Sequence, residues 1–140
     1  MDEQMVFASV TYGEVCQGCG ADLECHGVQL LVDGRLRWDV ESMCSACGSA
    51  LFACGGDVPG ERRDQMLSEH GPATLHVISP SARNVAVMRV LRAELDIDLV
   101  DAEAVLRRVR SGDCSGTLPE RELLSRKLRA AGLAAVATRS

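Results

Sequence analysis

Four cysteines form two Cys-x-x-Cys pairs, and a glycine follows each pair directly. The pairs are Cys16 with Cys19 and Cys44 with Cys47, and 24 residues separate them. Zinc in structural sites takes four soft ligands in a tetrahedron, and a spacing of two residues lets one tight turn present both sulfurs to one ion. The glycine allows a backbone turn that a Cβ atom would hinder. We therefore expect one structural zinc ion held by these four thiolates.

Other chemistry fits these pairs less well. A thioredoxin-like Cys-x-x-Cys opens a helix after a strand of a parallel sheet, and neither pair has that context. A catalytic zinc keeps an open position and commonly uses histidine or carboxylate ligands, whereas four cysteines close the shell. His26 is the one residue that we weigh as a substitute ligand, because it stands beside Cys25. The other three cysteines are expected to be small buried or half-buried side chains: Cys25, Cys54 and Cys114.

The composition indicates a cytoplasmic protein with two chemically different halves. We expect a reducing compartment, because the chain has seven cysteines and no basic and apolar leader follows Met1. We expect no membrane span, because no run of about 18 apolar residues occurs. Residues 1–72 carry twelve acidic residues and four arginines, whereas residues 73–140 carry eight acidic and eleven basic residues. Because the balance changes from −8 to +3, we expect two domains, 1–72 and 73–140.

The first half has the short runs of β-strands. We expect strands at residues 6–10, 26–32, 35–40 and 49–53. Asp33-Gly34 separates the second run from the third, and this dipeptide is typical of a two-residue hairpin turn. Such a hairpin would bring the two cysteine pairs together at its open end. A helix is expected between residues 57 and 72, with Met66 and Leu67 buried.

The second half is expected to form a three-stranded sheet covered by three helices. Strands are predicted at residues 74–78, 114–118 and 133–137, and the first helix at residues 83–95. Asp98 can cap the second helix, and Thr117 with Glu120 has the pattern of a capping box that opens the third, which Gly132 would end. Apolar residues at helical spacing predict the core: Val85, Met88, Leu91, Val105, Leu106, Leu124 and Leu128.

Both halves resemble known domains. The two Cys-x-x-Cys-Gly turns resemble those of the zinc-ribbon group, a resemblance that specifies architecture more than activity. Residues 74–139 resemble the C-terminal domain of the bacterial ribosomal stalk protein. The matching blocks are Val-Met-Arg-x-Leu-Arg at 87–92, Ile-x-Leu-x-Asp-Ala at 97–102 and Leu-x-x-Ala-Gly at 128–132.

The resemblances imply an α+β fold, with a zinc-ribbon-like β domain followed by a stalk-like α/β sandwich. In the stalk family, basic residues of this region help to form the surface that recruits translation GTPases. Arg89 and Arg92 match the first block, whereas other positions depart from the family. Its glycines are replaced by aspartates and its lysines by other residues: Asp96, Asp98, Val100 and Glu103. The fold is therefore expected to carry over, but the partner is not.

The sequence favours a non-catalytic protein-binding module in which zinc supplies rigidity. It shows no phosphate loop, nucleophile elbow or convincing pair of carboxylates that would indicate an enzyme or a small-molecule substrate. An acidic first half can attract a basic partner, as in an immunity protein that masks a toxin or in an adaptor. The candidate contact residues are Asp33, Asp39, Glu41, Asp57 and Glu61, with Arg89 and Arg92 as a second set.

Two alternatives stay open. The first is a transcription or translation accessory protein that contacts nucleic acid or a translation factor, and its basic residues would bind phosphates. We prefer the interpretation that the same residues form a solvated, partly salt-bridged helix face: Arg107, Arg108, Arg110, Arg121, Arg126, Lys127 and Arg129. The second alternative is an enzyme of a class that the sequence does not reveal.

Overall fold

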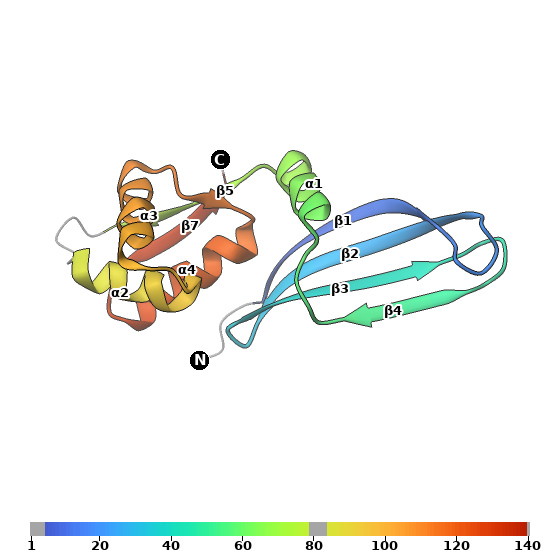
Figure 1. Ribbon diagram of the computed structural model, residues 1–140, viewed down its shortest axis with the longest axis horizontal. Coiled ribbons are helices and arrows are strands. Elements are labelled where there is room, and N and C mark those ends of the chain that lie inside the picture. The colour runs from blue at the N-terminus through green and yellow to red at the C-terminus, as the bar shows by residue number, and fades with distance from the viewer. Residues whose placement is uncertain (1–4, 79–83, 140) are drawn as a thin grey trace. The chain divides into compact units, whose positions relative to one another are not determined.

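The computed structural model describes residues 5–78 and 84–139, and the chain divides into two compact units. The N-terminal unit comprises residues 1–70 and the C-terminal unit residues 71–140, so the division lies two residues before the one expected. The described residues form a mixed α/β protein with one four-stranded sheet, one three-stranded sheet and four helices (Figure 1).

The N-terminal unit contains an antiparallel sheet in which each strand pairs with the next along the chain (Figure 1). Its strands are β1 (Val6–Val15), β2 (Asp22–Val32), β3 (Arg35–Met43) and β4 (Ala50–Cys54). The predicted hairpin turn is confirmed, since Asp33 and Gly34 both have positive φ, 51° and 74°, as a type I′ turn requires. β1, β2 and β3 are longer than predicted because cross-strand pairing continues up to the two cysteine turns.

Helix α1 (Gly60–His70) covers one face of this sheet. Met66 is buried in a small core with three sheet residues: Ala8, Val10 and Trp38. The Trp38 ring lies directly on Gly27, where an added Cβ would stand 2.2 Å from a ring carbon. The helix predicted between residues 57 and 72 is thus present, although Leu67 is only half-buried.

The C-terminal unit contains an antiparallel sheet in the order β6-β5-β7, together with three of the helices. Its elements in chain order are β5 (Ala73–Val77), α2 (Asn84–Leu95), α3 (Leu99–Ser111), β6 (Ser115–Gly116), α4 (Leu118–Ala130) and β7 (Ala135–Arg139). Figure 1 shows β5 and β7 side by side, as their pairing requires. The predicted element order is confirmed, while residue 83, the expected start of the first helix, lies outside the described residues.

Two predicted helix caps are confirmed in this unit. The Asp98 carboxylate accepts a hydrogen bond from the Asp101 amide at the start of α3. At the start of α4, the Thr117 hydroxyl accepts from the Glu120 amide, and the Glu120 carboxylate accepts from the Thr117 amide. These side chains satisfy N–H groups that a helix start leaves unpaired. Because Thr117 caps α4, the strand predicted at residues 114–118 shortens to the two residues of β6.

One predicted core position of the C-terminal unit is wrong. Val85 is 69% exposed, whereas Val87 is fully buried beside Leu91. Positions 87 and 91 share one face of α2, while position 85 is rotated by about 200° from position 87 around the helix. The other predicted core residues are buried (Leu91, Leu106, Leu124, Leu128) or half-buried against the core (Met88, Val105).

Candidate metal centre and adjacent pocket

The two cysteine turns have the same backbone geometry. In each turn the amide of the first cysteine donates to the carbonyl oxygen five residues later, at 2.8 Å in both. The amide four residues later, that of Gly20 or Gly48, donates back to the carbonyl of the first cysteine at 2.8 and 2.9 Å. Gly20 and Gly48 have φ of 78° and 75°, in the left-handed region that favours glycine. The backbone conformation at both positions therefore explains why a glycine follows each cysteine pair, as predicted.

The sulfur atoms of Cys16, Cys19, Cys44 and Cys47 all lie within 4.8 Å of one another. Between the two turns, the sulfurs of Cys16 and Cys47 are 3.8 Å apart and those of Cys19 and Cys44 are 3.5 Å apart. Four sulfurs about 2.3 Å from a central zinc ion would stand about 3.8 Å apart in a tetrahedron. The arrangement is consistent with a metal site made by the four predicted ligands.

The thiols of the cluster influence one another strongly. Hydrogen bonds with the side chain and amide of Ser49 lower the pKa of Cys47 to about 6. At Cys19 the Ala21 amide favours the thiolate, but the neighbouring thiols outweigh it and raise the pKa to about 12. Four thiols at this separation resist ionising together, because each thiolate repels the next. A divalent cation at the centre removes that repulsion, so the chemistry of the cluster suits a metal ion.

The remaining cysteines and His26 lie outside the cluster. All seven cysteines are free thiols, with Cys25 and Cys114 buried and Cys54 exposed, so the expected burial of Cys54 is wrong. The His26 ring has other partners: its Nδ1 is 3.2 Å from the Thr11 hydroxyl, and its Nε2 is 2.9 Å from a Glu24 carboxylate oxygen. His26 therefore does not serve as a substitute ligand in this arrangement.

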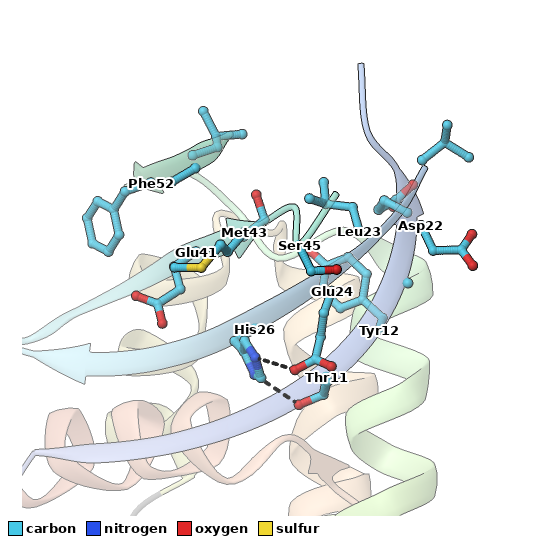
Figure 2. Close-up of a pocket in the computed structure, with 16 residues that line it drawn as sticks. Thr11, Tyr12, Asp22, Leu23, Glu24, His26, Glu41, Met43, Ser45 and Phe52 are labelled. Carbon is cyan, nitrogen blue, oxygen red and sulfur yellow. Dashed lines mark hydrogen bonds and ion pairs between the residues drawn. The ribbon is translucent and has the colours of Figure 1, made fainter. Parts of the chain in front are cut away.

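An open pocket of about 1250 Å³ lies at the end of the sheet next to the cysteine turns (Figure 2). Among the described residues that line it are four carboxylates but no lysine or arginine: Glu14, Asp22, Glu24 and Glu41. Four apolar side chains of the lining are more than half exposed: Val15, Met43, Leu51 and Phe52. Side chains alternate along each strand, so Asp22, Glu24 and Glu41 share one face of the sheet with Val15, Met43 and Phe52, whereas Glu14 and Leu51 lie on the opposite face.

Strand register builds this pocket from residues that are distant in sequence. Thr11, His26, Glu41 and Phe52 form one row across the four strands. Figure 2 shows the His26 ring directed toward Thr11 and Glu24, and dashed lines mark both interactions. Sequence reasoning missed Asp22, Glu24 and Phe52 as members of one surface. Cross-strand pairing outward from the Asp33-Gly34 turn is the signal that aligns β2 with β3, but β1 and β4 have no comparable marker.

The predicted acidic contact residues do not form one surface. Of the five, Glu41 lines the pocket. Asp39 is buried, with its carboxylate 3.0 Å from the Arg37 guanidinium and 3.3 Å from the Gly55 amide. The other three are exposed residues outside the pocket lining: Asp33, Asp57 and Glu61. The expectation that Asp39 offers its charge to a partner therefore conflicts with its burial.

Arg89 and Arg92 line a second pocket, of about 560 Å³, in the C-terminal unit. Its lining also includes Asp96 and the exposed apolar side chains of Val85 and Leu99. The pair of arginines predicted as a second contact set is therefore brought together on one surface of α2. This surface is smaller than the acidic pocket and carries charges of both signs.

Comparison with known proteins adds no relative: no family model matches the chain, and no curated protein or solved structure is significantly similar to it. The zinc-ribbon and stalk resemblances therefore rest on the sequence motifs. Among the described helices, none is both long enough and apolar enough to cross a membrane.

Proposed function

We propose that this protein is a non-catalytic binding module in which a structural zinc ion joins the two cysteine turns and the adjacent pocket binds a basic segment of another protein. The observation that carries this proposal is a pocket with three carboxylates on one sheet face, no described lysine or arginine in its lining, and exposed apolar side chains. The zinc site fixes the ends of the strands that supply this lining.

Zinc is the metal that the four thiols suit best. The sulfur separations match tetrahedral coordination, and zinc accepts four cysteine ligands in structural sites. Four thiolates fill all four positions, so substrate has no open position and the proposed role is structural. The filled site would carry a charge of about −2, next to a pocket that already has three carboxylates on one sheet face.

The charge of the pocket points to the chemistry of the partner. A concave surface of one sign focuses the electric field and raises the rate at which an oppositely charged partner arrives. The exposed apolar groups can then be buried against the partner, which supplies affinity that charge alone does not. A basic segment with interspersed apolar residues meets both requirements. An immunity protein that masks a basic toxin and an adaptor are two forms of such a module.

We also infer a zinc-ribbon-like N-terminal unit and a stalk-like C-terminal unit. The paired cysteine turns on a hairpin-rich sheet support the first inference. The order β5-α2-α3-β6-α4-β7 with an antiparallel three-stranded sheet supports the second.

The two alternatives, an enzyme and a protein that contacts nucleic acid, receive less support. For an enzyme, Thr11, His26 and Glu24 do form a hydroxyl–imidazole–carboxylate chain. The His26 and Glu24 side chains are 52% and 69% exposed, however, so water surrounds them. Binding to nucleic acid would need basic groups free to meet phosphates. Several basic residues of α4 are instead held by acidic side chains, as Lys127 is by Glu94, and Arg126 and Arg129 by Glu122.

Charge reversal tests the proposal. Proteins that co-purify with the zinc-loaded chain from its own cells are identified, and the rate of association with each is measured. Replacing Glu24 and Glu41 by lysine should slow association by about tenfold or more at low salt, because the field that steers the partner is reversed. The matched control replaces Asp57 and Asp64 by lysine. Both are exposed and lie outside the pocket lining, so the net charge changes equally.

Both double variants should retain zinc and the thermal stability of the parent protein. Slowing that is equal in the two variants would mean that net charge acts without the pocket. Unchanged association in both variants would contradict the proposed function.

A further inference from the structure

The two edge strands of the N-terminal sheet differ in how far the rest of the unit covers their outward backbone groups. Beyond β1, side chains of α1 bind the outward-facing carbonyls: His70 Nε2 donates to Ser9 at 2.7 Å, and Gln65 Nε2 donates to Thr11 at 2.9 Å. An added strand would need these carbonyls for its own amides. Helix α1 therefore blocks strand addition along this part of β1.

The edge at β4 is open. In the described residues β4 pairs with β3 alone, and all five residues of β4 are exposed. The Cys44 amide bonds the Ser49 carbonyl, so the hydrogen-bonded pairs that follow are Ser42 with Leu51 and Val40 with Ala53. The alternate residues of β4 then point their N–H and C=O groups away from β3: Ala50, Phe52 and Cys54. An edge with exposed backbone groups is a template for another strand.

The side chains along this edge continue the acidic pocket. Phe52 is 66% exposed and stands directly opposite Glu41 of β3 on the same sheet face. On the next strand inward, Glu41 stands opposite His26, whose ring binds Glu24. A strand added beside β4 would place every second side chain on this face, beside Phe52 and within reach of Glu41.

Charge distinguishes a foreign segment from a second copy of the chain. Two copies paired through β4 would bring two acidic pockets and two negatively charged metal sites close together, which like-charge repulsion opposes. A basic segment would instead be attracted to the same surface. Charge complementarity therefore favours a basic partner at this edge.

We propose that the partner binds as a fifth strand, with an extended basic segment pairing antiparallel or parallel with β4 and alternating basic and apolar side chains on the pocket face. This rests on the proposed function and adds how the partner is recognised. Backbone hydrogen bonds to Ala50, Phe52 and Cys54 would supply affinity, and the pocket would select the side chains.

The probe is a nine-residue peptide that alternates arginine and valine, with blocked ends, added to the zinc-loaded full-length protein. Amide hydrogen exchange is measured by NMR with and without the peptide. Exchange at the amides of Ala50, Phe52 and Cys54 should slow by about tenfold, which corresponds to a newly formed hydrogen bond of about 1.4 kcal/mol. A peptide with glutamate in place of arginine should leave these amides unchanged.

Two variants at one position separate the side chain from the backbone. Phe52→Ala removes the ring and keeps the outward amide, whereas Phe52→Pro also removes the amide without breaking a bond to β3, as proline permits on an edge strand. Phe52→Pro should bind the arginine–valine peptide about tenfold more weakly than Phe52→Ala does. Zinc content and unchanged exchange in β1 and β2 show that both variants are folded.

The possible results are distinct. Equal binding by Phe52→Pro and Phe52→Ala, without slowed exchange in β4, would overturn strand addition and leave the proposed function standing. A dimer that protects the β4 amides in the absence of peptide would assign the edge to a second copy and overturn the basic partner. Failure of the peptide to bind the parent protein would also overturn strand addition, whereas the proposed function is judged by the captured partner and the charge-reversal pair.

Discussion

The four clustered cysteines differ in their surroundings. Cys16 and Cys44 are 4% and 0% exposed, and each begins its turn with a backbone hydrogen bond. Cys19 and Cys47 are exposed, and the Cys47 sulfur is 3.1 Å from the Ser49 hydroxyl. The first cysteine of each pair is thus part of the folded interior, while the second faces water. Loss of an interior ligand should harm both metal binding and folding.

Replacing Cys44 by serine should abolish zinc binding and unfold the N-terminal unit. Three ligands hold structural zinc far less tightly than four, and the binding free energy of such a site is largely folding free energy. Metal analysis should give one zinc per chain for the parent protein and a large loss in the variant, with helical signal from the C-terminal unit retained. Cys54→Ser is the matched control, because Cys54 lies outside the cluster and should keep its zinc. Parent protein without zinc, with both pairs oxidised to disulfides, would contradict the assignment.

Zinc affinity should fall as pH falls. Metal binds thiolates, so a ligand whose pKa lies above the working pH must release a proton when the metal binds. The pKa of Cys19 is raised to about 12, so at pH 7 this thiol is protonated in the metal-free cluster. The pKa of Cys47 is lowered to about 6, so its proton begins to compete with metal only near that pH. Competition with a chelator between pH 8 and pH 5 should show steadily weaker binding, and a pH-independent affinity would count against thiolate coordination.

Among the elements, helix α2 has one face in the core and another on the smaller pocket, and its rotation about its axis sets both. Val87 and Leu91 face the core with Leu106 of α3 and Leu128 of α4. Val85 and the two arginines Arg89 and Arg92 lie on exposed parts of the same helix and line the smaller pocket. A rotation of α2 about its axis would exchange core and surface, so burial at single positions tests the fold.

Leu91→Asp should lower the free energy of unfolding of the C-terminal unit by at least about 3 kcal/mol, because apolar burial worth about 1.5–3 kcal/mol is lost and a carboxylate must be buried. Val85→Asp is the matched control on the same helix, and since Val85 is 69% exposed it should change stability little. Urea unfolding followed by helical circular dichroism measures both. Similar stability for the two variants would contradict the position of α2.

At the scale of the whole molecule, two units with separate cores differ in how they are stabilised. The core of the N-terminal unit is small and centres on Trp38 and Met66, whereas the core of the C-terminal unit is built from aliphatic side chains of three helices and the sheet. A small core commonly needs a metal or another cross-link. The N-terminal unit should therefore depend on zinc, and the C-terminal unit should not.

Thermal unfolding should show two transitions, and a chelator should lower the midpoint temperature of only one of them. Ligand that binds only the folded state stabilises it by mass action, so removing zinc should destabilise the N-terminal unit alone. NMR signals of Trp38 and Leu91 report on the two units separately. A single transition that shifts as a whole on chelation would contradict this independence.

Features of the fold that depend on neighbours along the chain can be predicted from the sequence. The Asp33-Gly34 turn, the caps at Asp98 and Thr117, and the glycines of the cysteine turns are local, because a few consecutive backbone dihedrals and side chains specify them. The four metal-site cysteines could be grouped for the same reason, since each pair shares one tight turn.

Which distant residues share a surface becomes visible only in the folded chain. The acidic pocket joins Thr11 of β1 to Phe52 of β4, and only the register of three strand pairings sets that meeting. The burial of Asp39 and the exposure of Val85 were likewise beyond local patterns, because alternation shows that a face exists but not what packs on it. The blocked edge at β1 and the open edge at β4 follow from where α1 lies, which no residue of β1 or β4 encodes.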